Sequence, residues 1–135
     1  MMSNLVGIIH LIYNQLKKIL DNNNTILGFK EIRYFECVDL LDTFIELFPN
    51  TKIICHYREN VDLQCKSGWW TEKDKNNLLE YNEQLINYCN KNNKYCYLST
   101  MEEMLNIEYI KKMFIFLEEN FDKNKYKYIL NDNMH

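Results

Sequence analysis

The chain of 135 residues has a mass of 16.5 kDa, which suits one domain over residues 1–135 and is too short for two complete cores. Hydrophobic residues make up 47% of the chain and aromatic residues 14%, so the composition excludes a largely disordered protein. The formal net charge of −3 excludes the overall basic field that is typical of nucleic-acid-binding domains.

The first half of the chain predicts two helices and two strands. Apolar residues recur at helical spacing over residues 3–20, which predicts an amphipathic helix. Residues 26–35 resemble a strand that runs into a loop, and residues 38–48 a buried helix that ends at Pro49. The β-branched segment 51–57 (TKIICHY) predicts a short, buried parallel strand.

The second half alternates helical and strand-like segments in the same way. We expect a helix over residues 60–67, an interruption at Gly68-Trp69-Trp70 and a longer helix over 72–90. A strand over 95–99 and one or two helical turns over 101–105 follow. Asn106 caps a last helix whose apolar stripe reaches Phe121, and residues 123–135 form a tail. Short strands that alternate with longer helices predict an α/β fold, with a parallel sheet of about three strands flanked by helices.

Neither targeting nor metal signals are present in the sequence. The longest apolar run, residues 5–13, is shorter than the ~18 residues of a membrane span, and it lacks the flanks of a signal peptide. Five cysteines form no CxxC pair, and the chain has three histidines. We therefore expect a cytoplasmic protein with reduced, mostly buried thiols, no metal and no membrane contact.

Arginine is rare in this chain, which has 14 lysines and 2 arginines, Arg33 and Arg58. Only arginine offers a planar pair of donors for a carboxylate or a phosphate. Arg58 follows the predicted strand directly, and the helix expected from about Asn60 presents free amide groups that favour an anion. Open parallel sheets bind ligands beyond the carboxyl ends of their strands, so this position suits a phosphate or sulfate monoester.

Ser67 stands nine residues after Arg58. A regular helix between the two would separate them by about 13 Å along its axis, so the chain must bend, at the Gly68 interruption, for both to grip one phosphate. The alternative is that Arg58 forms an ion pair with Glu59 or Asp62 and that Ser67 is an ordinary exposed serine.

Three segments, in this order, carry a family resemblance: GFKEIRY, then LFPNTKIICHYREN…KSGWW, then YLSTMEEML…FIFLEENFD. Over about residues 28–122 they resemble the C-terminal half of sulfotransferase domains that use 3′-phosphoadenosine 5′-phosphosulfate (PAPS). The resemblance implies that Arg58 and Ser67 bind the 3′-phosphate of PAPS or of its product, 3′-phosphoadenosine 5′-phosphate (PAP). Where that family carries Asn-Pro or Asp-Pro after the arginine, this chain has Glu59-Asn60.

Enzymes of this family begin with a P-loop-like strand, turn and helix whose amides cradle the 5′-phosphosulfate. The residues before Gly28 hold one glycine, Gly7, within an apolar helical stripe. We therefore expect a truncated P-loop-NTPase-like fold that keeps the 3′-phosphate side of the nucleotide site and is incomplete for sulfuryl transfer unless another chain completes it. The alternative is a non-catalytic relative that self-associates or binds a protein partner.

Four further positions each have a chemical and a structural interpretation. Glu31 is a candidate general base by the resemblance, but it shares a strand face with Arg33 and can form an ion pair with it. His56 is expected to be buried and hydrogen-bonded rather than catalytic. Trp69 and Trp70 can stack on an adenine or acceptor, or anchor the helix interruption in the core.

The segment KNKYKY, residues 123–128, combines lysines with tyrosines near the C-terminal end of the sequence. Lysine and tyrosine can bind nucleic acid together. We interpret the segment instead as a solvated end, so nucleic acid is not an expected partner.

Overall fold

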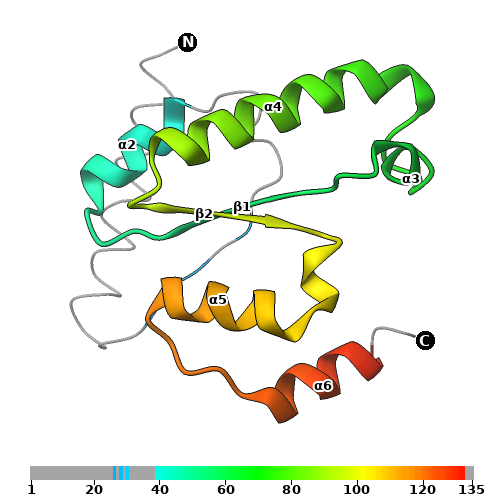
Figure 1. The fold of residues 1–135 in the computed structure, drawn as a ribbon. Helices are drawn as coiled ribbons and strands as arrows, with labels where there is room; N and C mark the ends of the chain where they lie inside the picture. Colours follow the sequence, from blue (N-terminus) through cyan, green and yellow to red (C-terminus); the bar gives the residue numbers. More distant parts are fainter. Residues whose placement is uncertain (1–25, 27, 29, 31–38, 133–135) are drawn as a thin grey trace. The chain divides into compact units, whose positions relative to one another are not determined.

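The computed structural model describes Ile26, Gly28, Lys30 and residues 39–132 (Figure 1). The chain divides into two compact units, Met1–Arg33 and Tyr34–His135, and every described helix and strand belongs to the second. The helix predicted over residues 3–20 lies outside the described residues. So do Glu31, Arg33 and most of the strand predicted over residues 26–35.

Two parallel strands form the centre of the described fold (Figure 1). Strand β1 (Ile53–Tyr57) pairs with β2 (Cys96–Thr100), in a register that places Ile53 opposite Cys96 and Tyr57 opposite Thr100. The parallel α/β prediction is confirmed. Where about three strands were predicted, the described part of the chain contributes two, because the remaining candidate strand lies among residues that are not described.

The crossover between the strands consists of α3 (Val61–Cys65), the 3-10 turn η2 (Glu72–Asp74) and α4 (Lys75–Lys91). Asn60 begins α3 as predicted, since its side chain accepts a hydrogen bond from the backbone of that helix. The predicted interruption is also confirmed: Gly68 has a φ of 89°, which favours glycine, between α3 and η2.

Helix α4 covers one face of the strand pair. Alternation along the strands puts Cys55 and Cys96 on this face, where they form a buried cluster with Cys89 of α4. A second cluster, made by Val61, Cys65 and Leu78, joins α3 to α4. The four described cysteines, Cys55, Cys65, Cys89 and Cys96, are buried, which confirms the burial expected for these positions.

The two tryptophans have different environments. Trp70 packs against the α3–α4 cluster, so the core-anchor interpretation holds for it. The side chain of Trp69 is 84% exposed.

Helix α5 (Ile107–Leu117) packs on the opposite face of β2, where the rings of Tyr97 and Phe116 lie 5.5 Å apart. Its cap by Asn106 is confirmed. The helix is shorter than predicted, because Glu118 adopts a left-handed conformation and ends it before Phe121.

The segment predicted as a tail forms a helix instead, α6 (Lys123–Asp132). The Asp122 carboxylate accepts hydrogen bonds from the first amides of α6. The Tyr126 hydroxyl donates to the carbonyl oxygen of Met104 at 2.8 Å. The lysines of α6 are exposed, as expected for a solvated face.

Two short elements complete the described fold. Helix α2 (Asp39–Leu47) confirms the helix predicted over residues 38–48 and is tied to α4 by a hydrogen bond from the Tyr88 hydroxyl to Asp42. The 3-10 turn η3 (Glu103–Leu105) connects β2 to α5. Among the described helices, none has the length and apolar character needed to cross a membrane.

Candidate functional site

The carboxyl ends of β1 and β2 lie side by side and form the edge at which the predicted site stands. The amide of Met101, just after β2, donates to the carbonyl oxygen of Tyr57, the last residue of β1, at 2.9 Å. This bond brings the two loops that leave the sheet together. We call this region, from Arg58 to Asn60 and from Met101 to Glu103, the carboxyl edge.

Arg58 is half-buried at the carboxyl edge, where the sequence placed it. Its backbone carbonyl accepts a hydrogen bond from the Asn82 side chain of α4 at 3.1 Å. Among the described carboxylates none forms an ion pair with the Arg58 guanidinium, and Asp62, one expected alternative partner, pairs with Lys75. The ion-pair interpretation of Arg58 is therefore not supported by the described residues.

Glu102 accepts hydrogen bonds from two amides that directly precede the first turn of α3. The amide of Glu59 donates to Oε2 of Glu102 at 3.2 Å, and the amide of Asn60 donates to Oε1 at 3.1 Å. Within α3, the amide of Leu63 donates to the Asn60 side chain and the amide of Val61 donates to the carbonyl oxygen of Glu59, so these two predicted donors are not open.

The electrostatics of Glu102 reflect this position. Loss of solvent around its carboxyl group raises the pKa, but the hydrogen bonds from the amides of Asn60 and Glu59 and the positive charge of Arg58 outweigh that effect. The pKa of Glu102 therefore lies below its usual value, and the group is an anion at neutral pH.

Ser67 does not reach the carboxyl edge through any contact in the described structure. It follows α3, where its hydroxyl donates to the carbonyl oxygen of Gln64 at 2.6 Å. Arg58 precedes the same helix, so α3 separates the two predicted phosphate ligands. The turn at Gly68 follows Ser67 directly in the chain.

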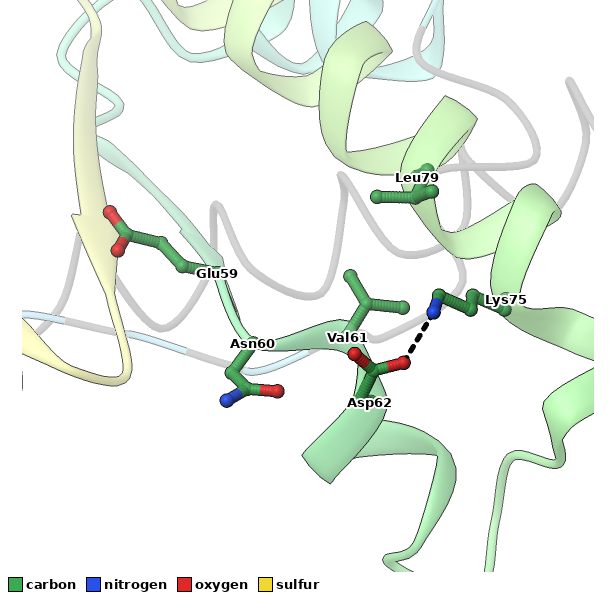
Figure 2. A pocket seen from close by; sticks show the side chains of 6 residues that line it. All are labelled: Glu59, Asn60, Val61, Asp62, Lys75 and Leu79. Carbon is green, nitrogen blue, oxygen red and sulfur yellow. Dashed lines mark ion pairs between the residues drawn. The ribbon is translucent and has the colours of Figure 1, made fainter.

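An open hollow of about 450 Å³ borders the carboxyl edge. Its lining residues come from the start of α3 and the start of α4: Glu59, Asn60, Val61, Asp62, Lys75 and Leu79 (Figure 2). Lys75 and Asp62 face each other there as an ion pair, which lowers the pKa of Asp62 and raises that of Lys75. Arg58 and Ser67 are not among the lining residues, so the hollow is a neighbour of the predicted pair and does not contain it.

His56 forms the hydrogen bond that was predicted, but it is exposed rather than buried. Its Nδ1 lies 3.2 Å from the Oγ of Ser99 on the α5 side of the sheet. Ser99 itself is 3% exposed and also contacts the sulfur of Met104. A buried hydroxyl enclosed in this way has no approach for a substrate, so the pair does not form a nucleophilic site.

Within residues 39–132 and the three described positions before them, no group of three or more His, Cys, Asp or Glu could hold a metal ion. Comparisons with protein-family models, curated proteins and solved structures find no match for this chain. The side chains and amides of the carboxyl edge are therefore the features from which a function can be inferred.

One residue of this edge escaped sequence reasoning. Glu102 lies 43 residues from the amide of Glu59 to which it is bonded. The residues Met101-Glu102-Glu103 directly follow a predicted strand, which indicates a loop at the carboxyl edge. Its partner could be identified only after the parallel register of β1 and β2 was known.

Proposed function

We propose that this chain is a sulfotransferase-like domain that binds the 3′-phosphate side of PAPS or PAP at the carboxyl edge. The observation that carries the proposal is the position of Arg58. It stands at the end of a parallel strand, makes no ion pair with a described carboxylate, and directly precedes two consecutive amides that point at an anion. Guanidinium and backbone amide donors are the groups that bind phosphate oxygens in proteins.

The donors at this edge fit a phosphate monoester. The guanidinium of Arg58 and the amides of Glu59 and Asn60 come from three consecutive residues, and the neighbouring hollow offers the apolar side chains of Val61 and Leu79. In this proposal the 3′-phosphate binds at Arg58, and the nucleoside lies over the hollow. Ser67 joins the site only if its hydroxyl leaves the carbonyl of Gln64.

When bound, PAPS would supply an activated sulfuryl group. Transfer of that group needs donors arranged around the moving oxygens. The described residues offer donors for the 3′-phosphate only, so the proposal covers nucleotide binding and not the transfer step. No general base is assigned, since Glu31 lies outside the described residues.

Calorimetric titration of the full chain with PAP tests the proposal. We expect saturable binding that Arg58→Ala weakens about ten- to hundredfold, because hydrogen bonds to charged groups contribute about 1.5–3 kcal/mol. Lys91→Ala is the matched control. It removes one exposed cation at the end of α4, which leads to the amino end of β2, and should leave the affinity unchanged. Absence of heat at millimolar PAP, or equal weakening by both variants, would contradict the proposal.

A second candidate function is a self-associating or partner-binding module. It is favoured by large apolar side chains that the fold leaves in solvent: Ile115 is 75% exposed, Tyr128 69% and Leu105 68%. Light scattering at increasing protein concentration tests it. A rising mass that Ile115→Lys abolishes would support this function, whereas a monomer at every concentration would contradict self-association.

A further inference from the structure

The turn between β1 and α3 already holds an anion, which is the chain's own Glu102. Both carboxylate oxygens of Glu102 are bonded, one to the amide of Glu59 and the other to the amide of Asn60. Two consecutive amides that point at the same group form a concavity of the type that binds anions. Arg58 precedes these amides directly and adds a positive charge. We call the two amides and the Arg58 guanidinium the anion seat.

The backbone builds this seat from both loops. On the β2 side, the Thr100 amide donates to the Glu103 carboxylate at 3.2 Å, and the Glu103 amide donates to the Thr100 hydroxyl at 3.1 Å. These reciprocal bonds fix the turn that presents Glu102. On the β1 side, Asn82 holds the carbonyl of Arg58 and the side chain of Asn60 caps α3. Bonds other than those of Glu102 therefore also hold the seat in place.

We propose that Glu102 is an internal competitor, and that a phosphate or sulfate group binds the anion seat by displacing the Glu102 carboxylate. This inference depends on the proposed function, because it describes the regulation of the same edge. A carboxylate and an external oxyanion accept the same hydrogen bonds, so they cannot both occupy the two amides. Their like charges also repel each other at this separation.

The competition predicts that removing the carboxylate strengthens anion binding. Loss of one negative charge within a few ångströms of the seat should tighten binding of a phosphate dianion by about tenfold or more. An anion that binds the folded chain also raises its melting temperature. Glu102→Ala should therefore respond to phosphate much more strongly than the natural chain does.

The experiment is a titration of the full chain with inorganic phosphate at constant ionic strength, followed by amide chemical shifts and by melting temperature. Glu108→Ala is the matched control, because it removes one carboxylate from the first turn of α5, where Glu108 pairs with Lys111. We expect Glu102→Ala to bind phosphate about tenfold more tightly than the natural chain, with the amides of Glu59 and Asn60 shifting. Glu108→Ala should behave like the natural chain.

If Glu102→Ala does not fold, Glu102→Gln provides the same test, because it removes the charge and keeps the shape of the side chain. Equal phosphate affinity in the folded Glu102 variant and the natural chain would overturn the inference, as would an equal gain in Glu108→Ala. Tighter phosphate binding by Glu102→Ala, in a chain that shows no affinity for PAP, would support the anion seat and contradict only the nucleotide function. PAP binding that depends on Arg58 but is the same in every Glu102 variant would support the nucleotide function and contradict the competition by Glu102.

Discussion

The side-chain amide of Asn82 donates a hydrogen bond to the backbone carbonyl oxygen of Arg58, with 3.1 Å between the two atoms. Asn82 lies within α4, the helix that covers the sheet, and Arg58 is the first residue after β1. The bond fixes the backbone from which the guanidinium projects. Asn82 is thus a positioning residue for the proposed phosphate site, since it acts through Arg58.

We predict that Asn82→Ala lowers the free energy of unfolding by about 1 kcal/mol and also weakens PAP binding. Asn87→Ala, at an exposed position of the same helix, should change neither quantity appreciably. Urea denaturation and calorimetry measure the two effects on the same samples. A loss of stability with unchanged PAP affinity would show that Asn82 has only a structural role.

The buried thiols should remain reduced and unreactive in the folded chain. The hydrogen bond between Cys55 and Cys96 raises the pKa of Cys55 and lowers that of Cys96, while burial raises the pKa of Cys89. Cys96 pairs with Ile53 in the register, so it is diagonal to Cys55. Two residues along a strand and one strand spacing separate their Cα atoms by about 8 Å, which is too long for a disulfide without movement of the backbone.

Alkylation mapped by mass spectrometry tests this prediction. Cys55, Cys89 and Cys96 should react only after urea unfolds the chain. Modification of any of them at the rate of the unfolded chain, or a Cys55–Cys96 disulfide in the native protein, would contradict the packing described for this cluster.

Much of the described fold follows from local patterns in the sequence. Apolar spacing predicted α4 to within a few residues, and the β-branched run predicted β1 and therefore the position of Arg58. Two features depended on information that local patterns do not carry. Phe121 follows Leu117 at helical spacing, and a glutamate gives no signal for the left-handed turn at Glu118 that ends α5. Glu102 joins the site through a contact that exists only because β1 and β2 pair in parallel.

The hydroxyl of Tyr88 should make stability depend on pH in the alkaline range. Loss of solvent raises its pKa, and the hydrogen bond to Asp42 and the charge of that carboxylate raise it further. Because the folded-state pKa lies above the ordinary value near 10, the stabilisation is complete below that pH and decreases as the pH rises above it.

We predict that Tyr88→Phe is less stable than the natural chain by about 1 kcal/mol at pH 7, and that the difference shrinks as the pH rises above about 10. Tyr128→Phe, at an exposed position of α6, should follow the natural chain throughout. Urea denaturation at several pH values measures the effect. Parallel pH profiles for Tyr88→Phe and the natural chain would disagree with this assignment.

Glu118 ends α5 with a φ of 59°, and the amides of Glu118 and Glu119 donate to the carbonyls of Ile115 and Phe114. This is the arrangement in which glycine is favoured. We predict that Glu118→Gly raises the free energy of unfolding by about 0.5 kcal/mol, because glycine adopts the left-handed conformation without strain. Two smaller effects oppose this gain: the unfolded chain becomes more flexible, and the exposed ion pair with Lys52 is lost.

Glu119→Gly provides the comparison for that substitution, since no left-handed φ occurs at Glu119. It should be neutral or destabilising. Thermal denaturation of both variants is sufficient, and a Glu118→Gly variant that melts below the natural chain would contradict the strain argument.

The central claim is that Arg58 binds the 3′-phosphate of the nucleotide. A thermodynamic cycle that combines one substitution with one change of ligand tests it most directly. Calorimetry would measure four affinities: those of the natural chain and of Arg58→Ala, each for PAP and for 5′-AMP, which lacks the 3′-phosphate. We predict that the natural chain prefers PAP by about tenfold or more and that Arg58→Ala loses this preference. Equal affinity of the natural chain for the two nucleotides, or a preference for PAP that persists in Arg58→Ala, would contradict the claim.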